Sequence, residues 1–322
     1  METSIRSGVY KSSSGRASTP QQTASDTSAM LTTTFHNQTL SNGVNVHYAE
    51  SGHQDAPILL LLHGFPSTNL QFRNLIPLLA ASYHIIAPDL PGFGHTVLPQ
   101  GTVPSFDLMA ETISQLVDAL GICKFAVYVF DYGAPTLFRL ALKRPELIAG
   151  IVTQNGNAYD EGLGADFWGG LQKWWAEGDE YGPMREVLFG AVGDIEWTKA
   201  QYYDGVPEEN VKLVDPQMYT LDYLQHLADP AKRDTQMRIF WDYQNNVKLY
   251  PRFQEYLRTH QPPVLAVWGE NDPCFVYPGA LAYKRDVPKA EIELLPGGHF
   301  LLETHVREVA GLMRQFLGRL KW

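Results

Sequence analysis

The segment VFDYGAP, residues 129–135, places Asp131 between an apolar run and the start of an expected helix. The small residues Gly133 and Ala134 permit a tight strand-to-helix turn, and Pro135 suits the first turn of the helix. A side chain at such a turn is presented for nucleophilic attack. A carboxylate there would attack an sp³ carbon that carries a leaving group, giving an ester intermediate. Alternatively, Asp131 simply caps the helix, a position where Asp is favoured.

Three further motifs each follow an apolar run: HGFP at 63–66, GENDP at 269–273 and GGHF at 297–300. Ligands of open α/β sheets bind beyond the carboxyl ends of the strands, so these motifs should meet. Asp131, Asp272 and His299 then follow the chain order nucleophile, acid, base. His299, oriented by Asp272, would activate water.

Backbone N–H groups beside the nucleophile would hold the negative oxygen that forms when the ester is cleaved. The turn in HGFP would supply the N–H of Phe65, and the N–H of Tyr132 would complete this oxyanion hole. His63, from the same motif, is predicted to line the substrate site. No metal or organic cofactor is needed for this chemistry.

Short continuous apolar runs indicate strands buried on both faces, and therefore a mainly parallel sheet between helices. An antiparallel hairpin, 35–40 and 44–51 around Asn42-Gly43, precedes them. The expected strands are 58–62, 85–87, 125–129, 148–152, 264–267 and 292–295. The expected helices are 70–81, 107–119, 135–143, 249–259 and 306–317.

Residues 156–246 interrupt this alternation, because they contain no strand-like run and five of the seven tryptophans. Such an aromatic-rich helical insertion is typical of a cap that closes over a pocket. Alternatively, most of these aromatics form only the cap's own small core. The predicted core domain comprises 33–155 and 247–322, and the Ser/Thr-rich segment 1–32 is predicted to be a disordered tail.

Composition restricts the partners. The formal net charge is −10, with 25 Lys+Arg against 35 Asp+Glu, which disfavours nucleic acid and anionic membranes. The apolar runs are far shorter than the roughly 20 residues that a membrane-spanning helix needs. The expected partners are water and a small apolar or aryl-bearing molecule. Cys123 and Cys274 are expected to be unpaired thiols of a protein in a reducing compartment, the cytoplasm.

Over residues 34–320 the chain resembles the epoxide hydrolase and haloalkane dehalogenase branch of the α/β-hydrolase superfamily. The matching segments are LLLLHGFPSTNLQFRNLIPLL, HIIAPDLPGFG, VYVFDYGAP, VLAVWGENDP and LLPGGHFLLE. The resemblance implies an α/β-hydrolase fold with a helical cap and an Asp nucleophile. One departure is Val129, because that branch usually has Gly two residues before the nucleophile.

Within that branch, the resemblance favours epoxide hydrolysis. Similar dehalogenases carry Trp directly after the nucleophile, where this chain has Tyr132, and Asn or Glu where it has Phe65. Tyr243 matches the place of a ring-opening tyrosine in epoxide hydrolases. The second cap tyrosine stays open, with Tyr159 as first choice; the other candidates are Tyr202, Tyr203, Tyr219 and Tyr223.

Haloalkane dehalogenation is the alternative, with Trp241 or another cap indole binding the halide, and Trp241 is counted among the substrate-binding residues. Fluoroacetate dehalogenases resemble the chain less, because arginines follow their nucleophile. A non-catalytic ligand receptor on the same fold is a further alternative. Esterase or lactonase activity is disfavoured because Asp131 occupies the place of a nucleophilic serine.

Overall fold

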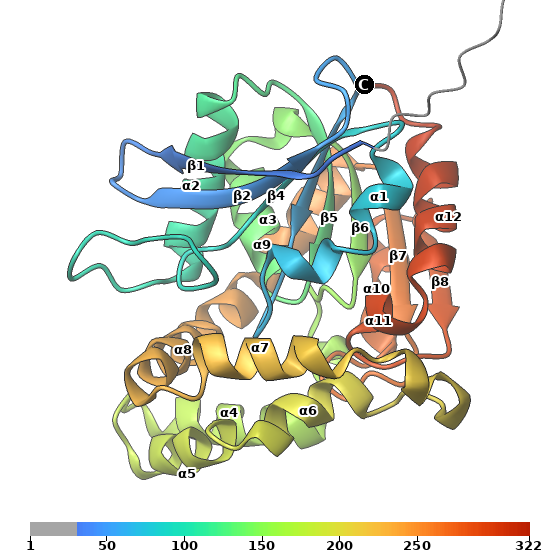
Figure 1. The fold of residues 1–322 in the computed structure, drawn as a ribbon. Coiled ribbons are helices and arrows are strands. Elements are labelled where there is room, and N and C mark those ends of the chain that lie inside the picture. The colour runs from blue at the N-terminus through green and yellow to red at the C-terminus, as the bar shows by residue number, and fades with distance from the viewer. Residues whose placement is uncertain (1–30) are drawn as a thin grey trace, which may run out of the picture. The chain divides into compact units, whose positions relative to one another are not determined.

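A computed structural model describes residues 31–322. Their centre is an eight-stranded sheet with the order β1-β2-β4-β3-β5-β6-β7-β8 (Figure 1). β2 is antiparallel to both β1 and β4, whereas the pairs from β4 to β8 are parallel. The strands are β1 Thr34–Thr39, β2 Asn45–Ser51, β3 Ile58–Leu62, β4 His84–Pro88, β5 Phe125–Phe130, β6 Ile148–Gln154, β7 Val264–Gly269 and β8 Glu291–Leu295.

The central strands β5, β6 and β7 are buried along their whole length, which explains their continuous apolar sequence. Alternate residues of β5 belong to two different core clusters: Val127 and Val129 face one, and Tyr128 and Phe130 face the other. The sheet therefore separates two apolar layers, as predicted from the sequence.

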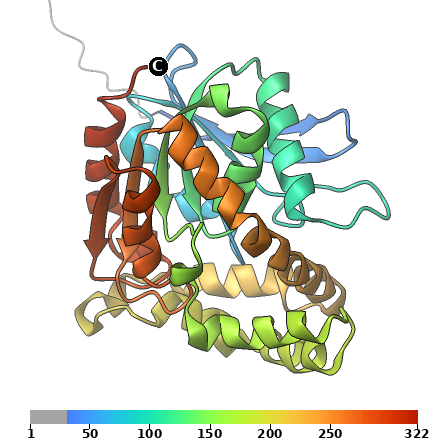
Figure 2. The same cartoon turned by 180° about the vertical axis from the view of Figure 1, so that it is seen from behind.

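Helices cover both faces of the sheet. α2, α3, α9 and α10 pack on one face, and α1 and α12 on the other (Figures 1 and 2). Their bounds are α1 Ile76–Leu79, α2 Phe106–Ala119, α3 Gly133–Lys143, α9 Gln244–His260, α10 Pro278–Asp286, α11 Leu301–Thr304 and α12 Val306–Leu317.

The expected helix over 70–81 is wrong. A 3₁₀ turn, η1 Asn69–Phe72, is followed by the single turn α1. The Thr68 side chain caps η1 by accepting from the N–H of Leu70. Pro77 lies in the first turn of α1 and has no N–H to continue a helix from η1. Two short elements therefore replace one helix.

Between β6 and β7 the chain forms helices and no named strand, as expected for 156–246. Helices α4 to α8 lie together at one end of the sheet in both views (Figures 1 and 2). This layer contacts the strand-end loops, since the Phe240 ring centroid is 4.7 Å from that of Phe65. The bounds are α4 Ala165–Glu177, α5 Pro183–Val192, α6 Ile195–Tyr203, η4 Glu208–Leu213, α7 Pro216–His226 and α8 Pro230–Asp242.

The domain boundaries at 155/156 and 246/247 remain predictions, because residues 31–322 pack as one unit. The predicted disordered tail lies, but for its last two residues, outside the described residues. Within the described part of the chain, no helix has the length and apolar character needed to cross a membrane.

Candidate active site

Asp131 directly follows β5 and has a φ of +47°, in the left-handed region that Asp tolerates better than most residues. Its side chain is turned back toward the loop after β3, where Oδ1 accepts a 2.6 Å hydrogen bond from the N–H of Phe65. A Cβ on Gly64 would lie 2.3 Å from that oxygen, so only glycine permits this approach. The predicted turn and the predicted N–H donor therefore meet.

Val129 fits despite the glycine expected at its position. Its Cγ2 lies 3.3 Å from where a Cβ on Gly156 would stand, so the glycine after β6 leaves room for the valine. The turn after β5 therefore accommodates a valine because the loop after the neighbouring strand β6 has a glycine beside it.

The electrostatics of Asp131 combine a dry environment with specific donors. Burial raises the pKa of Asp131 to about 6, although His299 and the N–H groups of Phe65 and Tyr132 act to lower it. The carboxyl group is therefore mostly ionised at neutral pH, and it is less strongly hydrated than a carboxylate in water. Both properties suit a nucleophile.

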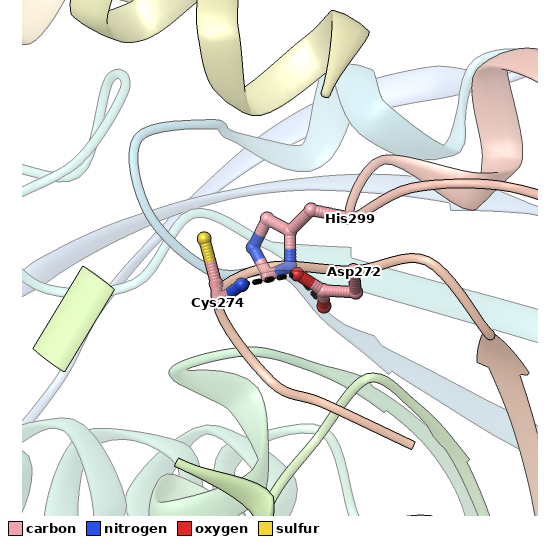
Figure 3. Close-up of side chains that lie close together, drawn as sticks. All are labelled: Asp272, Cys274 and His299. Atoms are coloured by element: carbon pink, nitrogen blue, oxygen red, sulfur yellow. Dashed lines mark hydrogen bonds and ion pairs between the residues drawn. The ribbon is translucent and has the colours of Figure 1, made fainter. Parts of the chain in front are cut away.

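Asp272 and His299 follow β7 and β8, and they are hydrogen bonded to each other. Nδ1 of His299 donates to Oδ2 of Asp272 at 2.7 Å, and both side chains are buried (Figure 3). The N–H of Cys274 donates to Oδ1 of the same carboxylate at 2.7 Å. Asp272 is thus held in a position that orients the imidazole.

His299 lies among aromatic rings, with its ring centroid 4.6 Å from that of Phe130. Burial alone would lower its pKa, but Asp272 and then Asp131 outweigh burial and raise the pKa above 6.5. The structure thus brings together Asp131, Asp272 and His299, whose catalytic roles remain predictions.

Asn155 was missed by the sequence analysis. It follows β6 with a φ of +49°, and its Nδ2 donates to Oδ2 of Asp272 at 2.7 Å. Its Oδ1 accepts from the N–H of Gly269 at 2.9 Å, tying the acid to the end of β7. An Asn directly after an apolar strand, at the edge where the other motifs meet, was the available signal.

Tyr243 is fully buried at the junction of α8 and α9, and its ring centroid is 5.8 Å from that of Tyr132. Burial raises the pKa of Tyr243 well above 10, and the Tyr250 hydroxyl and Asp131 add to this effect. The hydroxyl groups of Tyr243 and Tyr250 are 3.3 Å apart. Both phenols therefore keep their protons at neutral pH, and the charge of Asp131 acts on both of them.

Tyr250 is a candidate for the second tyrosine that the sequence analysis left open. It lies on α9, seven residues beyond Tyr243, and Nδ2 of Asn157 also donates to its hydroxyl at 3.3 Å. It lies outside the predicted cap, which ended at residue 246, and for this reason it was not considered. The spacing of two helical turns was the signal that could have identified it.

The Tyr159 side chain packs against α10. Asn157 accepts from the N–H of Tyr159 and turns the chain toward α10, where the Tyr159 ring centroid is 5.0 Å from that of Tyr283. The Arg285 guanidinium covers the ring at 5.0 Å. The other candidates are also engaged elsewhere: Tyr202 donates to Asp222, Tyr223 donates to the Gly193 carbonyl, and Tyr203 packs against Tyr219.

His63 and Trp241 both lie in packed surroundings, and their contact with substrate remains a prediction. Both ring nitrogens of His63 are bonded to backbone, one to the Gly64 carbonyl at 3.0 Å and one to the N–H of Leu90 at 2.9 Å. His63 therefore shapes the loop that carries Phe65. Trp241 packs against Trp174, with ring centroids 5.0 Å apart, and belongs to the core of the helical layer.

Comparisons with known proteins agree with this architecture. A family model described as alpha/beta hydrolase fold matches residues 57–306, so the chain belongs to the α/β-hydrolase family. Its class is accordingly that of a hydrolase.

The chain is 50% identical over 276 residues to an uncharacterized hydrolase from Saccharomyces cerevisiae, covering 86% of this chain and 94% of that protein. It is 26% identical to a haloalkane dehalogenase from Psychrobacter cryohalolentis, covering 85% of this chain and 88% of that protein. It is 24% identical to epoxide hydrolase 3 from Mus musculus, covering 86% of this chain and 75% of that protein.

Proposed function

We propose that this hydrolase opens an epoxide to a diol through an ester on Asp131. The observation that carries the proposal is the hydrogen-bonded pair of buried hydroxyl groups of Tyr243 and Tyr250, both of which interact electrostatically with Asp131. An epoxide oxygen leaves as an alkoxide and needs a proton, and a neutral phenol can supply it.

In the first step, Oδ2 of Asp131 attacks one epoxide carbon while Oδ1 stays on the N–H of Phe65. The carbon–oxygen bond breaks, and the departing oxygen takes the proton of the Tyr243 hydroxyl. The high pKa of Tyr243 keeps that proton in place until the alkoxide forms. The Tyr250 hydroxyl can hydrogen bond to the resulting phenolate and thus stabilise it.

In the second step, His299 takes a proton from water, and the hydroxide attacks the ester carbonyl of Asp131. The oxyanion forms on Oδ1, where the N–H groups of Phe65 and Tyr132 stabilise it. The ester then collapses to the diol and the carboxylate, and the proton on His299 returns through solvent to the Tyr243 phenolate. Asp272 stabilises the imidazolium through its 2.7 Å bond.

Haloalkane dehalogenation is the second candidate, because a halide could accept from the indole of Trp197, whose ring centroid is 5.8 Å from that of Phe65. The other nearby indoles support it less. Those of Trp168 and Trp175 already donate to the carbonyls of Cys274 and Phe240. A halide would thus have one indole donor rather than a pair.

The test is turnover of styrene oxide, epoxyhexane, bromobutane and p-nitrophenyl butyrate by the purified protein. Asp131→Asn and Tyr243→Phe are the informative variants. Tyr256→Phe is a matched control, because Tyr256 is a buried tyrosine on α9 that packs against Phe138 and His260.

Diol formation that both informative variants lose and the control keeps would support the proposal. Halide release that survives Tyr243→Phe would move the assignment to a dehalogenase. Ester cleavage that survives Asp131→Asn would contradict a carboxylate nucleophile. Failure of every epoxide and haloalkane to give product or a covalent adduct would favour a non-catalytic receptor.

A further inference from the structure

A cavity of about 230 Å³ extends from the protein surface to the catalytic cluster. It lies between α4, α6 and the loop after β7, and Cys274 of that loop lines it. Cys274 is buried, and its sulfur lies within 4.8 Å of ligand atoms of Asp272 and His299. Figure 3 shows the sulfur on the side of the imidazole away from the bond to Asp272. The inner end of the cavity therefore lies beside the free nitrogen of His299.

An aromatic wall of the same cavity borders the loop that holds the nucleophile. The half-buried Trp197 of α6 lines the cavity, and its ring centroid is 5.8 Å from that of Phe65. Phe65 is the residue whose N–H donates to Asp131. Phe167 of α4 also lines the cavity, with its ring centroid 5.8 Å from that of Trp197. A molecule that passes through this cavity thus reaches both the nucleophile side and the base side of the site.

The Gln201 side chain indicates that the cavity holds a ligand or water. Gln201 lines the cavity from α6 and is only 5% exposed. Its Nε2 has no hydrogen-bond partner in the part of the chain that the structure describes. A buried amide without a partner destabilises the protein, so a molecule in the cavity that bonds to this amide would be held there.

The mouth of the cavity carries negative charge. Asp166 of α4 and Asp204 at the C-terminal end of α6 line it, and both are exposed. Among residues 31–322, neither carboxylate is in an ion pair, and no Lys or Arg lines the cavity. Burial, then Asp272 and Asp131, and then Asp204 raise the pKa of the Cys274 thiol. The charge of Asp204 therefore acts at the inner end of the cavity as well as at its mouth.

We propose that this cavity is the substrate entrance and that Asp166 and Asp204 exclude negatively charged substrates. The proposal rests on the proposed function and narrows it, because the substrate is then an epoxide that carries no negative charge. Like charges slow the association of an anion, whereas a neutral molecule of the same shape is unaffected. The volume is below the roughly 300 Å³ at which pockets for drug-sized ligands begin, so the entrance suits small molecules.

The test compares two styrene oxides that carry either a carboxylate or a carboxamide at the para position, since these have nearly the same shape and differ in charge. We expect kcat/KM of the wild type to be at least about 5-fold higher for the carboxamide at low ionic strength. Combining Asp166→Asn with Asp204→Asn should lower this ratio at least about 3-fold. Salt at about 1 M should lower the wild-type ratio in the same way, because it screens exposed charges beyond about 3 Å.

The matched control combines Asp55→Asn with Glu308→Gln. This variant has the same net charge as the cavity variant, but the two exposed carboxylates that it removes do not line the cavity. It should keep the wild-type ratio of kcat/KM. An equal fall of the ratio in both double variants, or no change of the ratio in the cavity variant, would overturn the proposal.

Thiol alkylation tests the same entrance without epoxide turnover. Iodoacetamide and iodoacetate differ only in charge; in both reactions the thiolate sulfur attacks the methylene carbon and iodide leaves. Mass spectrometry compares the two rates at Cys274 with those at Cys123, which is exposed. We expect the preference for iodoacetamide to be larger at Cys274 than at Cys123, and to shrink in the variant that lacks both Asp166 and Asp204. A change in the thiol pKa alters both rates alike and cancels in the ratio.

An equal preference at the two cysteines, or no alkylation of Cys274 by iodoacetamide over hours at pH 9, would overturn the entrance even if epoxides are turned over. If no epoxide is turned over but the larger preference at Cys274 depends on Asp166 and Asp204, the proposed function fails and the charge-selective entrance stands. The two failures are therefore distinguishable.

Discussion

Replacing Asp131 by Asn should stabilise the folded protein while abolishing activity. Asn removes the buried charge, keeps a carbonyl oxygen to accept from the N–H of Phe65, and tolerates the φ of +47° at this position. The gain in the free energy of unfolding therefore measures how much the buried negative charge destabilises the folded protein, because the backbone conformation at this position stays the same.

The magnitude follows from the pKa of Asp131. Folding raises this pKa from 3.8 to about 6, so the folded state binds the proton more tightly than the unfolded state. The native enzyme thus loses stability as the pH rises from about 3.8 to about 6, and the full penalty applies above that range. It amounts to about 3 kcal/mol at pH 7 and roughly half of that at pH 5. Without the charge of Asp131, protonated His299 loses a favourable interaction. The measured gain in stability should therefore be smaller than these two free energies.

Urea denaturation of wild type and Asp131→Asn at pH 7 and pH 5 measures both values. We expect a gain of at least about 1 kcal/mol at pH 7 that is roughly halved at pH 5. Asp55→Asn removes an exposed charge as a control and should change stability by less than about 0.5 kcal/mol. A variant no more stable than wild type, or a gain equal at both pH values, would contradict a raised pKa of Asp131 in the folded protein.

Three further predictions follow from the same geometry. Tyr243→Phe should lower kcat/KM for styrene oxide at least about 100-fold in steady-state kinetics, because the leaving alkoxide loses its proton donor. Tyr256→Phe is the control, and an equal fall of kcat/KM in both variants would contradict the role of Tyr243. Asn155→Ala should lower the free energy of unfolding in urea by about 2 kcal/mol and also lower kcat, because Asp272 and the N–H of Gly269 each lose a hydrogen-bond partner. Asn155→Gly tolerates the positive φ, so it should be more stable than the alanine variant while its kcat stays low. His299 must be neutral to take a proton from water, so ester hydrolysis should speed up as the pH rises through the pKa of His299 in the ester intermediate. Rapid-quench mass spectrometry should then find more covalent adduct at pH 5.5 than at pH 8, and equal amounts would contradict the role of His299 as base.

The sheet was predictable from the sequence because strands buried on both faces have continuous apolar runs. The expected run at 58–62 coincides with β3, and the other runs differ from their strands by at most two residues at each end. The expectation failed over 70–81, where capping by Thr68 and the position of Pro77 break the helical pattern. The local structure of that segment depends on backbone hydrogen bonds, which the spacing of apolar residues does not indicate.

The positions of Asp131, Asp272 and His299 were predictable because each follows a strand whose carboxyl end lies at the same edge of the sheet. Side chains farther from strand ends were not. Tyr159 follows a turn set by Asn157, and Trp241 packs against Trp174. Their directions depend on tertiary contacts that no spacing in the sequence encodes. The cytoplasmic location and the apolar substrate remain predictions.

The central claim is that a carboxylate oxygen of Asp131 attacks the substrate carbon, and oxygen labelling tests it most directly. A single turnover of excess enzyme with styrene oxide in water enriched in ¹⁸O should leave the diol unlabelled, since its new oxygen comes from Asp131. Mass spectrometry of the peptide that contains Asp131 should then show one ¹⁸O. Labelled diol with an unlabelled Asp131 peptide would mean that water attacks the epoxide directly, and the account would be wrong.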